Sequence, residues 1–416
     1  MPDYLIAAAS GSGAWQGDNT TVYMAPVGNL PGDFGTEAWA QMVARDSYTL
    51  SKLYVRVKSN SINTTVAVRS RKNGAYGNQI ISVPSSTTGV FTDTVNTDSL
   101  VDGDLFCTES YAPNVTGDQT IVFTIFSYIL STLANTTPIL GACGKATLYA
   151  GYTQYLTIVG YALSIIAAPE WKAYYKFRVA ATLSNLRVYV SANAITNDST
   201  IRTRIDAANG NQTLTILAST TGAFEDATNT DNIAVGQNVN CQFVGGEDIT
   251  SLTLTYIEMK SNSDGRQVAA AASHIIPFNP GLTRYVAIEG HPDYLSVGEA
   301  GVQATARSSF TAKNAYFNIL QNSLDGTSIY KLRKNGGDST LSVSIPAGTT
   351  GQLEDLVHTE DYIATDLVNW LVQSGGSSGE ITLGCSGFEL AQPAAPPVVG
   401  SKSANMGSKM VAAELI

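Results

Sequence analysis

The sequence predicts an all-β protein of three tandem antiparallel β-sandwich repeats of the jelly-roll type, about 130 residues each, with extended N- and C-terminal arms. Three observations support this prediction: an internal repeat, runs in which apolar and polar residues alternate, and turn signals between those runs. The repeat is clearest in a short motif whose three glycines lie 133 and 129 residues apart. The chain therefore contains three tandem copies of one structural unit.

Each copy of the motif has a Thr-Thr-Gly turn, a large apolar residue two positions after the Gly, and an Asp two positions later. We expect the Gly to take a conformation that other residues avoid, the apolar side chain to be buried, and the Asp to accept hydrogen bonds from loop amides. The motif residues are Thr88, Gly89, Phe91 and Asp93 in unit one, Thr221, Gly222, Phe224 and Asp226 in unit two, and Thr350, Gly351, Leu353 and Asp355 in unit three.

A calcium site is the alternative interpretation of the motif Asp. Asp98, Asp102 and Asp104 lie close behind Asp93 in the sequence and would supply further oxygen ligands. Their spacing does not match the loop of an EF-hand, so we favour the structural interpretation and expect neither a metal nor any other cofactor.

The repeat extends well beyond the motif. An Arg stands 44 residues before the motif Gly in every unit, as Arg45, Arg178 and Arg307. Asn-Gly steps at 73–74, 209–210 and 335–336 predict two-residue hairpin turns, because both residues tolerate positive φ. Runs such as 53–58 and 186–191 alternate with period two, which puts one face in a core and the other in water. About eight such runs per unit fit a jelly roll better than an immunoglobulin sandwich.

These signals divide the chain into seven segments. We expect an N-terminal arm (1–19), sandwich one (20–130), a connector (131–152), sandwich two (153–260), a connector (261–282), sandwich three (283–390) and a C-terminal arm (391–416). The first strand of each sandwich is expected near 22–24, 155–158 and 285–288. The second strand is expected around Glu37, Glu170 and Glu299.

The two arms are the candidate partner-binding segments. Neither can bury enough apolar surface to fold alone, so we expect them to order against other chains. The N-terminal arm has one large anchor, Trp15, and the C-terminal arm combines a Pro-rich spacer with an apolar end. The candidate assembly residues are Trp15, Met406, Met410, Val411, Leu415 and Ile416.

Composition excludes several functional classes. The net charge of −10 argues against binding to nucleic acid, which requires a basic surface. No run of 18 apolar residues exists, so no membrane span is expected. The four cysteines follow no metal-ligand spacing, and we expect free thiols.

Catalytic signals are equally sparse, and we do not expect an enzyme. The three histidines fall at unrelated places in the repeat, and the Gly-rich run 375–379 lacks the Lys that a phosphate-binding loop needs. A paired-carboxylate glycosidase stays open, because such pairs meet only in space. Tyr149, Tyr152, Tyr155 and Tyr161 form either a stacking platform for a sugar or strand faces packed at a junction, and we favour the junction.

The run 329–336 followed by 341–351 resembles β-sandwich repeats in virion proteins of tailed bacteriophages, and units one and two resemble it less closely around 71–74 and 209–210. The resemblance implies a structural virion protein without catalytic residues. We expect an exterior capsid decoration or cement protein held by its arms, with other capsid or tail proteins as partners and a homo-oligomer such as a trimer. The alternative is a tail fibre or lectin-like module that binds a host glycan. The missing basic start of a signal peptide fits a protein made in the host cytoplasm and located in the virion.

Overall fold

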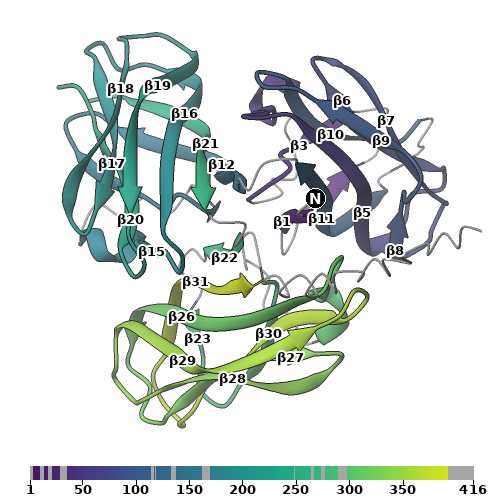
Figure 1. Ribbon diagram of the computed structural model, residues 1–416, viewed down its shortest axis with the longest axis vertical. Coiled ribbons are helices and arrows are strands. Elements are labelled where there is room, and N and C mark those ends of the chain that lie inside the picture. The colour runs from purple at the N-terminus through teal and green to yellow at the C-terminus, as the bar shows by residue number, and fades with distance from the viewer. Residues whose placement is uncertain are drawn as a thin grey trace, which may run out of the picture.

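The computed structural model describes residues 3–9, 14–16, 21–28, 35–113, 117, 119–132, 137–161, 169–247, 249–263, 267–272, 277–288 and 298–391. It is all-β, with three sandwiches placed side by side in a triangle (Figure 1). We call residues 3–132 unit one, 137–263 unit two and 267–391 unit three. Each unit consists of two sheets that pack face to face, and their strand pairs are antiparallel except for one parallel pair in unit two, between residues 142–143 and 160–161.

Unit one has sheets in the order β1-β11-β5-β8 and β3-β10-β6-β7, with β2 also on β11, β9 on β5 and β4 on β10. Its elements are β1 (Asp3–Ala9), β2 (Ala14–Gln16), β3 (Thr21–Met24), η1 (Glu37–Trp39), β4 (Met42–Val43), β5 (Tyr48–Asn60), β6 (Val66–Lys72), β7 (Ala75–Val83), β8 (Gly89–Thr92), β9 (Thr97–Leu100), β10 (Leu105–Tyr111) and β11 (Thr120–Thr132).

Unit two has sheets in the order β14-β12-β21-β16-β19 and β13-β20-β17-β18, with β15 also on β20. Its elements are β12 (Thr137–Tyr149), β13 (Thr153–Leu156), β14 (Gly160–Tyr161), η2 (Glu170–Ala173), β15 (Tyr175–Lys176), β16 (Ala181–Asn193), β17 (Ser199–Ile205), β18 (Ala208–Ile216), β19 (Gly222–Ile233), β20 (Asn238–Val244) and β21 (Ser251–Ser263).

Unit three has sheets in the order β22-β31-β26-β29 and β24-β30-β27-β28, with β23 also on β31 and β25 on β30. Its elements are β22 (Gln267–Ala272), β23 (Pro277–Phe278), β24 (Thr283–Val286), η3 (Glu299–Gly301), β25 (Ala304–Thr305), β26 (Phe310–Asn322), β27 (Ser328–Lys334), β28 (Gly337–Ile345), β29 (Gly351–Tyr362), β30 (Leu367–Gln373) and β31 (Ile381–Ala391). The same strand order thus occurs three times, which confirms the predicted tandem repeat.

The segments expected as an N-terminal arm and as connectors contain strands of the sandwiches. β1 pairs with β11 from Asp3↔Ser131 to Ala9↔Ile125, β12 pairs with β21, and β22 pairs with β31. The expectation that residues 1–19 order only against another chain is therefore wrong for the described part. Strands β1 and β22 are rich in Ala and show little alternation. The partners of all three strands lie far along the chain, so no local pattern reveals them.

The second expected strand of each unit is also wrong, because Glu37, Glu170 and Glu299 begin the short 3₁₀ helices η1, η2 and η3. The first expected strands are present as β3, β13 and β24, although β13 and β24 begin and end two residues earlier than expected. A three-residue run around one Glu is too short for its periodicity to separate a strand from a helical turn.

The hairpin turn of unit two does not lie at the Asn-Gly step. Asn209 and Gly210 belong to β18, and the two-residue turn is formed by Asp206 and Ala207, with φ of 47° and 66°. The other two steps do form the predicted turns, since Lys72 pairs with Ala75 and Lys334 with Gly337. A short Asp tolerates the left-handed conformation, which explains how unit two builds the turn without Asn-Gly.

Each unit has its own core, and each core also receives side chains from a neighbouring unit. Tyr256 of unit two is buried in the core of unit one, Tyr316 of unit three in the core of unit two, and Tyr54 of unit one in the core of unit three. Three such contacts close the triangle into a ring. Strand β31 is consequently buried along nearly its whole length, because one face meets its own core and the other meets a junction.

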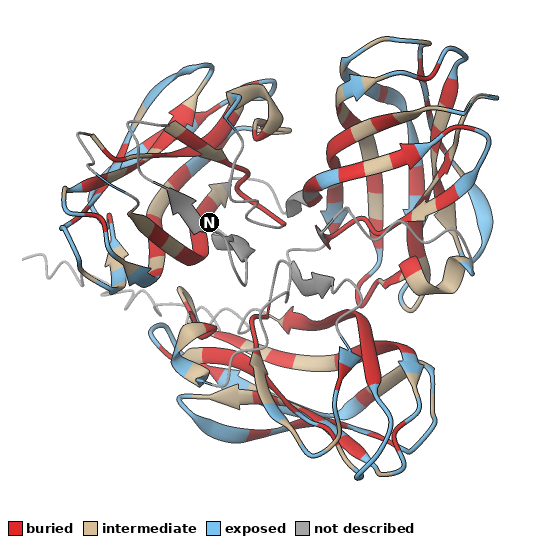
Figure 2. Cartoon of the chain, turned by 180° about the vertical axis from the view of Figure 1, so that it is seen from behind, coloured by how far each residue is buried: buried red, intermediate tan, exposed pale blue. Residues whose placement is uncertain are grey.

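The distribution of buried and exposed residues follows the ring arrangement of the three units. Buried residues gather inside the sandwiches and toward the centre of the ring, while exposed residues lie on the outer strands and loops (Figure 2). The exposed positions include the outer edge strands of each sandwich, β7, β18 and β28, whose side chains alternate between buried and exposed. Among the described residues, no helix is long and apolar enough to cross a membrane.

Candidate functional site

The junctions between units are built around the repeated Arg. The Nη1 atom of Arg45 lies 2.8 Å from the carboxylate of Glu225 in unit two. The Nη1 atom of Arg178 lies 3.1 Å from the carboxylate of Glu354 in unit three, which Lys176 also contacts. These Arg residues therefore join units, a role that the constant spacing of 44 residues did not reveal.

The junction between units one and two contains a second, buried carboxylate. Glu258 is 2% exposed, accepts a 2.6 Å hydrogen bond from Arg187 and lies 3.8 Å from Arg45. The backbone N–H of Val43 in unit one also donates to it, at 3.3 Å. Burial raises the pKa of Glu258, and the two Arg residues counteract that effect only in part. A buried carboxylate held by cations from two units makes this junction specific.

At the third junction the repeated Arg has different partners. Arg307 of unit three donates a 3.1 Å hydrogen bond to the carbonyl of Lys52 in unit one, and its guanidinium lies 5.4 Å from the ring centre of Tyr54. In the part of the chain that the structure describes, no carboxylate pairs with Arg307.

A second repeated ion pair lies inside each unit. Glu37 and Arg71 form two parallel hydrogen bonds of 3.1 and 2.8 Å, and the pairs Glu170–Arg204 and Glu299–Arg333 repeat the arrangement. The Arg follows the Glu by 34 residues each time. This bidentate contact ties each 3₁₀ helix to the neighbouring sheet and has the strongest geometry available to a carboxylate. The hydrogen bond between the side chains of Arg71 and Glu37 raises the pKa of Arg71, and burial opposes that rise.

The motif Asp has the predicted structural role. The carboxylate of Asp93 accepts hydrogen bonds from the backbone N–H groups of Ile80, Val95 and Asn96, at 2.9 to 3.0 Å. Asp226 and Asp355 make the equivalent bonds in units two and three. Burial alone would raise the pKa of Asp226, but the hydrogen bonds from Asn229 and from the loop amides outweigh it and lower the pKa to about 2.

The motif Gly also behaves as predicted, whereas the apolar residue does not. Gly89, Gly222 and Gly351 have φ of 114°, 112° and 95°, which only Gly adopts readily. Phe91, Phe224 and Leu353 occupy equivalent positions against the three cores but are half-buried, not buried. The cause is their place on the outermost strand of the sheet, which leaves one side of the ring in water.

A second repeated Asp bonds to strands of the facing sheet in two of the units. Asp98 accepts a 2.6 Å hydrogen bond from the hydroxyl of Ser70, and Asp231 accepts the same bond from Thr203. A side chain at Gly77 would clash with both the Ser70 hydroxyl and Asp98, at 2.3 and 2.8 Å. Unit three has Ser339 in place of this Gly and Glu360 in place of the Asp, so the two positions change together.

Three of the four candidate calcium ligands, Asp93, Asp98 and Asp104, are bonded to protein groups, and Asp102 is exposed. Asp104 accepts hydrogen bonds from Val101 and Asn73 and pairs with Lys72 at 2.9 Å. Asp98 is likewise bonded to Asn78 and Gln79. Among the described residues, no three His, Cys, Asp or Glu side chains are grouped so that they could hold a metal ion.

The described histidine and the serines of the Gly-rich run serve the fold. His358 contacts Asp355 through Nδ1 at 3.0 Å, and Asn96 and Asn229 make this contact in the other units. The run 375–379 also has the Gly-x-Ser-x-Gly spacing of a nucleophile elbow. Its hydroxyls, Ser377 and Ser378, instead donate to Asp325, at 3.1 and 3.0 Å. His274 and His291 lie outside the described residues.

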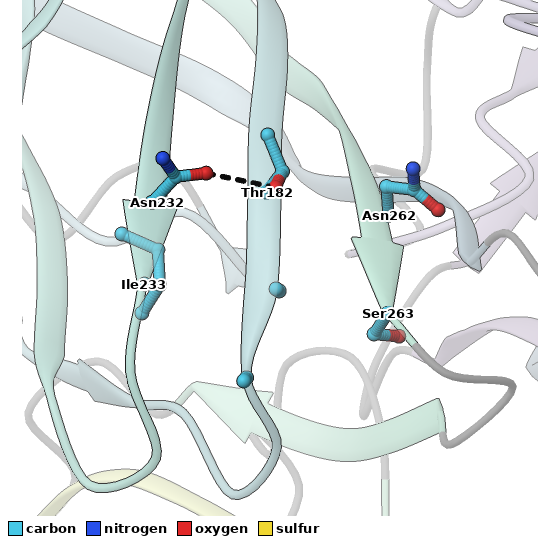
Figure 3. Close-up of a pocket in the computed structure, with 7 residues that line it drawn as sticks. Thr182, Asn232, Ile233, Asn262 and Ser263 are labelled. Atoms are coloured by element: carbon cyan, nitrogen blue, oxygen red, sulfur yellow. Dashed lines mark hydrogen bonds between the residues drawn. The ribbon is translucent and has the colours of Figure 1, made fainter.

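A shallow pocket lies at the end of unit two, between β16, β19 and β21 (Figure 3). It has a volume of about 380 Å³ and no titratable side chain in its lining, and the hydroxyl of Thr182 donates a 2.9 Å hydrogen bond to Asn232 across it. Such a surface can bind through hydroxyl and amide groups, and its described lining has no titratable group that could act as a general acid or base.

The tyrosine cluster is divided by the structure. Tyr149 and Tyr152 are exposed, at 51% and 63%, on either side of the turn between β12 and β13, while Tyr155 is half-buried. The side chain of Tyr161 lies outside what the structure describes. The two exposed rings therefore stay available to a ligand.

The predicted assembly residues are only partly placed. Trp15 pairs through its backbone with Ile121, the register position that Leu148 and Phe278 take in the other two units. Leu148 and Phe278 are both buried in their cores. Met406, Met410, Val411, Leu415 and Ile416 lie outside the described residues. Cys107, Cys241 and Cys385 are free and buried, as predicted.

Comparison with known proteins gives little guidance. No protein-family model matches the chain, and no curated protein matches it. Two solved structures are similar to it over most of its length. One is described as the triple jelly roll fold and turret assembly in an archaeal virus, with 12% identity, a TM-score of 0.18, and coverage of 93% of this chain and 91% of the other.

The second is described as the atomic structure of Sulfolobus turreted icosahedral virus, with 11% identity, a TM-score of 0.18, and coverage of 83% of this chain and 80% of the other. TM-scores at this level carry no argument about function. The functional interpretation therefore depends on the chain itself.

Proposed function

We propose that this chain is a structural virion protein of a tailed bacteriophage, with capsid decoration or cement as its role. The observation that supports the proposal most is how the repeated residues are used. Arg45 and Arg178 join one unit to the next, Glu37 and its equivalents brace each sandwich, and the motif Asp residues hold loops. Residues repeated in this way serve folding and assembly.

The proposal includes the absence of catalysis. The described polar pocket has no titratable lining, and the one described His hydrogen bonds within its own loop. A glycosidase would need two carboxylates facing one another across a bound sugar, and the described carboxylates discussed above are bonded to Arg, Lys or backbone amides.

Localisation on the particle is the direct test. Virions of the phage that encodes the chain are purified and analysed by mass spectrometry, and an antibody against the chain is located on them by electron microscopy. Label spread over the capsid supports decoration, and label confined to the tail tip supports the fibre alternative. A chain that is missing from purified virions contradicts the whole proposal.

A lectin-like receptor-binding module is the second candidate, favoured by the exposed rings of Tyr149 and Tyr152. Aromatic rings bind the apolar faces of sugars at low entropic cost. A glycan array with the wild type and the Tyr149→Ala variant tests this role. Binding of a defined glycan that weakens in the variant would support it, and an empty array would leave decoration as the better interpretation.

The C-terminal segment is the proposed attachment element. Strand β31 ends at Ala391, and the following 25 residues carry the Pro-rich spacer and the apolar end. An extended apolar peptide can add to an exposed sheet edge of a neighbour. Deletion of 392–416 should leave the melting of the three units unchanged but abolish incorporation into particles. Incorporation at wild-type occupancy would move attachment to a sandwich face.

A further inference from the structure

The three junctions of the ring use equivalent residues, so each can serve as a reference for the others. Arg45, Arg178 and Arg307 stand at the same place in their units and each reaches into the adjacent unit. In two junctions the guanidinium meets a carboxylate, Glu225 or Glu354. In both cases this Glu directly precedes the motif Asp.

The third junction has no carboxylate at that position. Glu225 pairs in register with Arg187, Glu354 pairs with Tyr316, and the equivalent pair in unit one is Thr92 with Tyr54. Thr92 is exposed, so the place that a carboxylate fills at the other junctions is open to solvent.

The groups around this position are cationic. Arg307 has only a carbonyl and an aromatic ring as described partners, and burial lowers the pKa of its guanidinium. Lys52 stands where Asn185 donates a 3.2 Å hydrogen bond to Glu225 in unit two. Arg56, two residues beyond Tyr54, donates to the carbonyl of Ala300 and has no described carboxylate partner.

The hydroxyl of Tyr54 adds a fourth polar group. Tyr54 is 2% exposed, and its hydroxyl has no hydrogen-bond partner among the described residues. The equivalent hydroxyl of Tyr316 accepts a bond from the backbone N–H of Lys176. A buried hydroxyl and a partly buried guanidinium without a counter-ion are costly in a chain whose net charge is −10.

We infer that the junction between units one and three is a binding position for a carboxylate supplied by another protein. Arg307 and Lys52 hold the carboxylate, and Thr92 leaves the position open. The incoming group is an acidic side chain or a chain-terminal carboxylate, because that is the chemistry that the two equivalent junctions provide internally. When a carboxylate of the partner binds there, the third junction gains the ion pair that the other two junctions have. Binding of the partner therefore stabilises the closed ring. This inference does not depend on the proposed virion role.

Acetate serves as the probe for this site, and the full-length chain is used throughout. The melting temperature is measured in sodium acetate and in sodium chloride at equal ionic strength, for the wild type and for three variants. Thr92→Glu supplies a carboxylate from within, Thr92→Gln is its neutral control of nearly equal size, and Arg307→Gln removes the cation.

Acetate should raise the melting temperature of the wild type by about 1–2 °C, with saturation, and should raise that of Thr92→Gln less, because the Gln side chain fills part of the position. Thr92→Glu should melt above Thr92→Gln in chloride and should not respond to acetate, because its position is already filled. Arg307→Gln should not respond either. A wild type that does not respond to acetate, or an equal response in all four proteins, would overturn the inference.

Discussion

Replacement of Tyr316 by Ala tests whether the ring is held by side chains that cross between units. Tyr316 is fully buried, its backbone belongs to unit three, and its ring belongs to the core of unit two. The guanidinium of Arg178 lies 4.8 Å from the ring centre, and the ring of Tyr175 lies 6.2 Å away, edge-on. The backbone N–H of Lys176 donates a 3.3 Å hydrogen bond to the hydroxyl.

The expected cost follows from these contacts. Truncation of a buried aromatic residue to Ala costs about 3–5 kcal/mol, and the lost cation–π contact puts Tyr316→Ala in the upper half of that range. Tyr316→Phe keeps the ring and removes only the hydroxyl, so it should cost about 1 kcal/mol. Tyr149→Ala is the matched surface control and should change stability by less than about 0.5 kcal/mol.

Unfolding in guanidinium chloride, followed by circular dichroism, gives the free energies of unfolding. Calorimetry adds a second observable, because Tyr316→Ala should shift the melting of units two and three together. A cost for Tyr316→Ala below about 1.5 kcal/mol, or a shift confined to unit three, would show that the junction contributes little and would refute this account of the ring.

Four further outcomes are expected. Because the pKa of Asp226 is lowered to about 2, its carboxylate stabilises the fold above the pKa of an unfolded Asp, and the benefit is lost as pH falls from about 4 toward 2. The wild type should therefore be more stable than Asp226→Asn at neutral pH, and the difference in their free energies of unfolding should shrink as pH falls through that interval. A difference that stays constant with pH would contradict this. Ala207→Gly should raise stability by about 1 kcal/mol, since Ala207 has a positive φ, and a loss of stability would reject the turn assignment. Phe91→Ala should cost about 2 kcal/mol, less than for a fully buried ring, and a cost above about 4 kcal/mol would mean that the side chain is buried. A chelator should leave the melting temperature unchanged, and a drop of several degrees would restore the calcium interpretation.

The local pattern of the sequence was sufficient to predict the fold class, the threefold repeat and the turn motif of each unit. Alternation with period two is a property of one strand, and a repeated Gly with positive φ or an Asp that bonds nearby amides is a property of one loop. Gly89, Asp93 and the free cysteines therefore behave as predicted. The ion pair between Glu37 and Arg71 could also have been predicted from the sequence, because a Glu and an Arg separated by 34 residues recur in every unit.

Only the tertiary structure decided which segments join the sheets and how the units meet. Strand β1 is Ala-rich and pairs with a strand more than a hundred residues later, so nothing near it in the sequence distinguishes it from an arm. Tyr54 alternates with the core residues Leu53 and Val55, so the local pattern places it on the face that meets water, yet it enters the core of unit three. Tyr256 has the alternation of its own unit's core, and no local signal says that it enters the core of unit one. The half-burial of Phe91 likewise depends on the position of β8 as the last of the described strands in its sheet. Strand partners and junction contacts form between residues distant in the sequence, and that long-range pairing carries no period along the chain.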